Sequence, residues 1–169
     1  PDIIYTEFEH VMAICIAGEN VLDTLYYDEM ERPVIAQIYG KDPEYFYHAA
    51  KVICALGFDG VDINMGCPAK TVSNGGAGGG LIKTPDLARE IIAATKEGVK
   101  HWVNTGELTG LREKAQSAIE EQITKNIGEA ITVSYQLSAI SCQPSNNLQS
   151  KTCNLNLEGQ SQQPDQLTN

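Results

Sequence analysis

Hydrophobic positions along the first 98 residues alternate between two spacings. Short apolar and β-branched runs predict strands over residues 3–8, 33–40 and 60–66. Between and after them, apolar residues recur every three or four positions, which predicts helices over residues 19–27, 42–57 and 84–98. Strands that alternate with helices in this way indicate a parallel sheet with helical connections.

Two of these helices carry clear end signals. The middle helix opens with Asp42 and Pro43, a side-chain cap and a first-turn proline, and is expected to end at Gly57. The last helix opens with Thr-Pro and is expected to end at Gly98. These signals make the helix boundaries part of the prediction.

Such a chain can close in two ways, as an open doubly wound sheet or as part of a (β/α)8 barrel. Both architectures gather their chemistry at the carboxyl ends of the strands. The polar candidates at these ends are Glu7, Gln37 and the turn from Asn64 to Cys67. Asp62 and Asn64 share one face of their strand, because successive side chains alternate.

The character of the chain changes after the third helix. Residues 99–108 can hold a short strand, residues 108–130 predict a charged amphipathic helix, and residues 130–140 have strand propensity. Residues 141–169 are rich in Gln, Asn and Ser with few aliphatic side chains, so we expect a disordered low-complexity tail. We therefore divide the chain into segments 1–98, 99–140 and 141–169.

Composition narrows the class of protein. The 169 residues carry a net charge of −10, which argues against this segment alone binding nucleic acid through phosphate contacts. No apolar run approaches the roughly 18 to 20 residues of a membrane-spanning helix. The five cysteines are irregularly spaced without a CxxC pair, which argues against a disulfide framework or a metal site and favours a reducing cytoplasm.

Each candidate side chain has two interpretations. Cys67, between Gly66 and Pro68, can be a nucleophile or proton donor, or simply a small buried hydrophobe. Asn64 and Gln37 can bind a ligand, or satisfy their own turn and the adjacent strand. Five of residues 75–80 are glycine, in a loop that can cradle a phosphate, fold over a flat ligand or pack against its neighbours.

One string makes a family resemblance specific. Residues 57–72 read GFDGVDINMGCPAKTV, preceded by AQIYG and followed by the glycine loop and LIKTPDLAREII. Over about residues 1–98 the sequence resembles the tRNA-dihydrouridine synthase family. The resemblance implies part of an FMN-binding TIM barrel, an α/β fold, with about three of its eight βα units. It also implies reduction of the C5–C6 double bond of uridine in tRNA, with NADPH or NADH as the reductant of FMN.

The resemblance also implies roles for three residues. By motif position Cys67 is the proton donor to C5, Gln37 contacts the flavin and Asn64 lies beside the substrate base. A general acid in this role must come within about 3 Å of C5, and a thiol suits it because it keeps its proton near neutral pH.

The sequence departs from the family elsewhere. The family's opening strand, its flavin-contacting Lys strand, its last phosphate-binding turns and its tRNA-binding helical domain have no match; Lys100 lies near the Lys position without the motif. We therefore expect a truncated copy that binds FMN weakly, with no membrane or metal partner. The alternatives are an inactive remnant without catalysis, or another FMN-dependent barrel oxidoreductase such as a dihydroorotate dehydrogenase relative.

Overall fold

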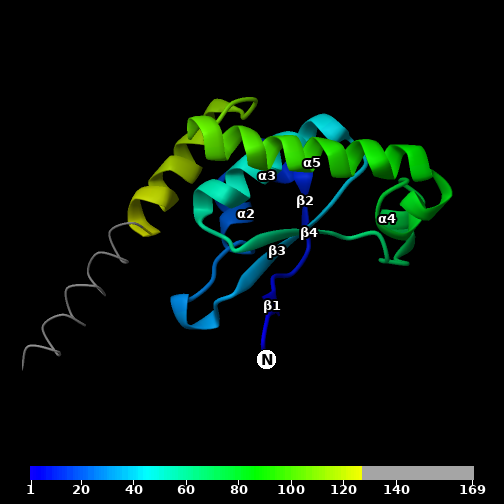
Figure 1. The fold of residues 1–169 in the computed structure, drawn as a ribbon, viewed down its shortest axis with the longest axis horizontal. Coiled ribbons are helices and arrows are strands. Elements are labelled where there is room, and N and C mark those ends of the chain that lie inside the picture. Colours follow the sequence, from blue (N-terminus) through cyan, green and yellow to red (C-terminus); the bar gives the residue numbers. More distant parts are fainter. Residues whose placement is uncertain (127–169) are drawn as a thin grey trace, which may run out of the picture.

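The computed structural model describes residues 1–126, apart from the side chains of residues 19 and 20 (Figure 1). Three expectations lie wholly or partly outside the described residues. They are the end of the helix expected over 108–130, the strand propensity of 130–140 and the tail of 141–169.

A parallel sheet forms the base of the fold. Its central strand β3 (Val34–Tyr39) pairs on one edge with β4 (Gly60–Ile63). On the other edge it pairs with two short strands, β1 (Ile4–Tyr5) and β2 (Glu9–His10). All of these pairings are parallel, as the alternation of strands and helices predicts.

The first predicted strand differs from the expectation. Instead of one run over residues 3–8, the chain pairs before and after Thr6–Phe8, and Glu9–His10 forms a second short strand. The register shifts by one residue between Ile4 opposite Val34 and Glu9 opposite Ile38. Inside this gap the Thr6 hydroxyl accepts the Gln37 backbone N–H at 3.1 Å, so a side chain replaces a backbone partner.

Helices cover one face of this sheet. In Figure 1, α3 (Pro43–Leu56) and α5 (Pro85–Thr105) run together on one side of the strands. The ends of α3 are as predicted, because the Asp42 carboxylate accepts the Glu44 N–H at 3.0 Å and Gly57 adopts a left-handed φ of 89°. The α/β fold with a parallel sheet, expected of part of a (β/α)8 barrel, is confirmed.

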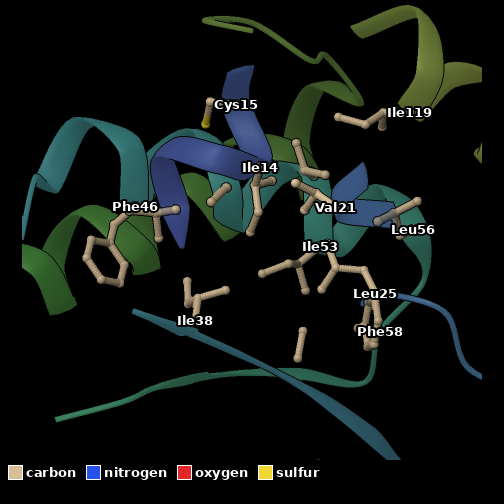
Figure 2. Packing of buried hydrophobic residues seen from close by; sticks show 14 of the residues in the cluster. Ile14, Cys15, Val21, Leu25, Ile38, Phe46, Ile53, Leu56, Phe58 and Ile119 are labelled. Atoms are coloured by element: carbon tan, nitrogen blue, oxygen red, sulfur yellow. The ribbon is translucent and has the colours of Figure 1, made fainter. Parts of the chain in front are cut away.

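The core lies between the sheet and this helix layer. Side chains of β3 alternate, and Val34, Ala36 and Ile38 are 0–1% exposed. Figure 2 shows Ile38 pointing from its strand toward Ile14 and Ile53 on the helices. Burial of these apolar side chains joins the helices to the sheet.

Helix α5 does not end at Gly98, as the sequence predicted, but continues to Thr105. Gly98 is buried, and a Cβ there would overlap the carbonyl oxygen of Tyr47 on α3. The glycine therefore allows two helices to approach closely instead of ending one. The helix ends at Gly106, with φ 67°, so residues 99–105 are helical and not a strand.

The region between β2 and β3 also differs from the prediction. The helix expected over 19–27 is reduced to α2 (Glu19–Leu22), with a 3-10 turn at Glu29–Glu31. Helix α1 (Val11–Ile16) was not predicted, because VMAICI is apolar on every side and has no helical period.

The chain beyond α5 returns to the helix layer. Residues 113–126 are helical, within the range expected for the amphipathic helix. Ahead of them, the Arg112 N–H donates to the Cys15 carbonyl at 3.0 Å. The buried Lys51 ammonium of α3 donates to the Thr109 carbonyl at 3.1 Å. These contacts attach the segment after Gly98 to α1 and α3.

Candidate active site at the strand ends

The face of the sheet away from the helices carries polar side chains. Gln37 on β3 lies directly opposite Asp62 on β4, and both are half-buried. Asn64 follows β4 on the same face, and its backbone N–H donates to the Ile38 carbonyl at 2.8 Å. The parallel register therefore brings these side chains together at the carboxyl ends of two neighbouring strands.

Hydrogen bonds join this group into one chain. The Gln37 Nε2 donates to Asp62 Oδ2 at 2.8 Å, and the Asn64 Nδ2 donates to Gln37 Oε1 at 3.0 Å. Asn64 Oδ1 accepts the backbone N–H groups of Gly66 and Cys67 at 3.2 and 3.0 Å. The three predicted site residues are thus connected, and Asp62 adds a fourth member to which the sequence assigned no role.

The glycine loop contacts the backbone of the Cys67 turn. The chain after the Cys67 turn forms α4 (Lys70–Ser73), then passes through the glycine loop into a 3-10 helix at Gly78–Lys83. The Gly79 N–H donates to the Cys67 carbonyl at 3.0 Å. A Cβ on Gly79 would lie 3.0 Å from that same carbonyl oxygen. Of the three interpretations of these glycines, close packing against neighbours is the one that this arrangement supports.

The described cysteines occupy different environments. Burial raises the pKa of Cys15 to about 12, partly opposed by the nearby Lys51 charge, and burial also raises the pKa of Cys54. Cys67 is half-buried between the exposed Gly66 and Pro68. Among the described thiols, it is the one that lies beside the polar strand ends.

Other polar candidates do not join this group. Glu7 is exposed, and its contribution is a carbonyl that accepts the Thr6 hydroxyl at 2.8 Å. His10 caps α1 by accepting the Met12 N–H, and burial lowers its pKa despite Glu9. His48 lies on α3, where burial lowers its pKa.

The chemistry of Gln37 fits the edge of a flat heterocycle such as a flavin. After its bonds to Asp62 and Asn64, the amide retains one N–H and one oxygen lone pair. A ring edge that alternates donors and acceptors can use both. Within residues 1–126, no three acidic, His or Cys side chains gather as metal ligands would. No helix of this part is long and apolar enough to span a membrane.

Comparisons with known proteins identify the family of this chain. The family model for dihydrouridine synthase (Dus) matches residues 1–130, which extends beyond the motifs that ended near Gly98. A probable tRNA-dihydrouridine synthase of Staphylococcus aureus (strain COL) is 42% identical over 100 residues, 58% of this chain and 30% of the relative. For probable tRNA-dihydrouridine synthase 2 of Bacillus subtilis (strain 168) the identity is 41%, over 58% of this chain and 31% of the relative.

The chain therefore spans about 30% of the length of these curated relatives. The family match covers more than half of the chain and includes the strands, the Cys67 turn and the glycine loop. On this evidence, the chain belongs to the dihydrouridine synthase family.

Proposed function

We propose that this chain forms part of an oxidoreductase that reduces uridine in tRNA to 5,6-dihydrouridine. The observation that carries the proposal is the hydrogen-bonded group of Gln37, Asn64 and the Cys67 turn at the ends of β3 and β4. Two amides and a thiol at one sheet edge suit a reaction on a flat ring with its own donors and acceptors.

Cys67 acts as the general acid. When FMN is bound and reduced by NADPH or NADH, it would supply a hydride to C6 of the uracil. The resulting charge on C5 and O4 is neutralised when the Cys67 Sγ–H gives its proton to C5, so the ring gains one hydride and one proton. The exposed residues on either side of Cys67 allow water to return a proton to the sulfur.

The two amides have separate roles. Gln37 uses its remaining N–H and lone pair to bind the edge of the flavin ring. Asn64 lies beside the substrate base and holds the Cys67 turn through its Oδ1. Both side chains therefore position the reacting groups without exchanging protons themselves.

The net charge of the chain and its free cysteines bear on how it binds tRNA and on the compartment in which it works. The net charge of −10 means that a tRNA substrate needs a basic surface from another part of the protein. Cys15, Cys54 and Cys67 are all free thiols, which agrees with a reducing compartment such as the cytoplasm.

The test is a Cys67→Ala substitution in a full-length Staphylococcus aureus relative whose matching 100 residues are replaced by those of this chain. Loss of the general acid should slow uridine reduction about 100-fold or more. Flavin reduction by NADPH should stay at the parent rate, since it needs no proton from Cys67. Stopped-flow flavin absorbance and dihydrouridine content of the tRNA measure the two half-reactions.

Cys54→Ala is the matched control, because Cys54 is a thiol on α3, on the helix side of the sheet. It should leave both half-reactions at the parent rate. Reduction of tRNA by the Cys67→Ala protein at the parent rate would contradict the assignment of the proton donor.

A further inference from the structure

Asp62 stands at one end of the hydrogen-bonded chain described above. Its Oδ2 accepts from Gln37, whereas the Asp59 carboxylate at the other end of β4 pairs with Arg32 at 3.0 Å. Among the described residues, no cation pairs with Asp62. A half-buried carboxylate held by a neutral amide loses hydration without an ion pair in return, so sheet pairing alone does not explain this residue.

The carboxylate restricts how Gln37 can lie. An amide side chain has almost the same shape in its two flipped orientations, so its partners decide which end faces which way. An ionised carboxylate can only accept, and therefore the Nε2 of Gln37 must face Asp62. The Oε1 of Gln37 then faces Asn64.

The same constraint extends to Asn64 and the Cys67 turn. With Oε1 of Gln37 as its neighbour, Asn64 must turn its Nδ2 inward, which leaves Oδ1 for the Gly66 and Cys67 N–H groups. The Cys67 turn offers only N–H donors, and Asp62 offers only oxygen acceptors. Both ends therefore require each amide to point its oxygen toward the turn and its nitrogen toward Asp62. An anion at one end therefore favours one arrangement of both amides.

We propose that Asp62 is a positioning residue of this site: it fixes the direction in which Gln37 presents its amide and, through Asn64, holds the turn of Cys67. The inference rests on the proposed function for the purpose of that turn, and it adds a residue to which that function assigned no role. Asp62 acts through Gln37 and touches no reacting atom.

The first test is Asp62→Asn in the ¹⁵N-labelled 169-residue chain, without flavin or tRNA. Asparagine has the same shape but can donate or accept, so one of the two constraints on the direction of Gln37 is lost, and only the Asn64 end remains. We expect hydrogen exchange of the Gly66 and Cys67 backbone amides to rise about 3- to 10-fold, the loss of one hydrogen bond's support. The Gln37 side-chain amide resonances should shift, while amides of α3 should exchange as in the parent.

The second test restores the anion at the neighbouring position. In the double variant Asp62→Asn with Gln37→Glu, the new carboxylate only accepts, so the amide introduced at position 62 and that of Asn64 both turn their nitrogens toward it. The direction of Asn64 is then constrained from both ends again. Exchange of the Gly66 and Cys67 amides should return close to the parent rate.

Asp86→Asn is the matched control, because it removes the same charge from an exposed carboxylate in the first turn of α5. It should leave the exchange of both turn amides unchanged. Unchanged exchange in Asp62→Asn, an equal increase along all of β3 and β4, or no recovery in the double variant would each overturn the proposal. Because no flavin, tRNA or turnover is involved, these outcomes are independent of the Cys67→Ala experiment.

Discussion

The two faces of β3 differ in composition and in what holds them. Val34, Ala36 and Ile38 face the helices and are fully buried, while Ile35, Gln37 and Tyr39 face away and are half-buried. The first face packs against apolar side chains of α1 and α3, and the second carries the hydrogen-bonded group of the site. A six-residue strand thus supplies stability on one side and the side chains of the candidate site on the other.

The difference has an energetic basis. Burial of a large aliphatic side chain contributes about 1.5–3 kcal/mol to folding. A hydrogen bond exchanged with water contributes about 0.5–1.5 kcal/mol net. The polar face can therefore be altered with less loss of stability than the apolar face, although it carries the residues of the proposed site.

Two neighbouring residues give the largest contrast. Ile38→Ala removes a core side chain that is fully buried and should lower the free energy of unfolding by about 3 kcal/mol. Gln37→Ala removes half-buried hydrogen bonds whose partners can turn to water, and should cost about 1 kcal/mol. Urea unfolding of both variants measures the difference, and equal losses would remove the distinction between the faces.

Gly98 tests how tightly the helix layer is packed. A methyl group at this position must displace the Tyr47 backbone, so Gly98→Ala should destabilise by about 2 kcal/mol although alanine favours helices. At Gly106 nothing lies near an added Cβ, and only its left-handed φ opposes alanine, at about 1 kcal/mol. If thermal unfolding ranked Gly106→Ala as the more damaging change, close contact of α3 with α5 would not explain Gly98.

Cys15 gives the apolar side a pH dependence. Burial raises the pKa of its thiol from 9.0 to about 12, so the folded state favours the neutral form. This contribution to the free energy of unfolding is fully present below pH 9 and is lost as the pH rises toward 12. By pH 10 the loss is on the order of 1 kcal/mol.

Cys15→Ala should abolish this part of the pH dependence while lowering stability at neutral pH through the lost packing. Urea unfolding of the parent and the variant between pH 8 and roughly pH 10.5 measures this difference in pH dependence. The two proteins differ over this range only in the Cys15 thiol. Parallel curves for the two proteins would show that burial does not hold the Cys15 proton.

Local signals in the sequence determined the central part of the molecule. Residues close together in the sequence specify the apolar run of β3, the cap of α3 at Asp42 and the end of α3 at Gly57. The structure has these features as predicted. The motif over residues 57–72 also indicated the family, and family membership is confirmed. The roles of Gln37, Asn64 and Cys67 stay predictions, although the structure brings the three residues together.

Contacts between distant segments decided the rest. Gly98 resembles a helix stop, but Tyr47, about fifty residues earlier in the chain, makes it a packing position. At the split of the first strand, the Gln37 N–H donates to the hydroxyl of Thr6, which lies about thirty residues earlier in the chain. Asp62 gained its partner only when the parallel register placed it opposite Gln37, because cross-strand neighbours are set by sheet pairing and leave no periodic signal in either segment.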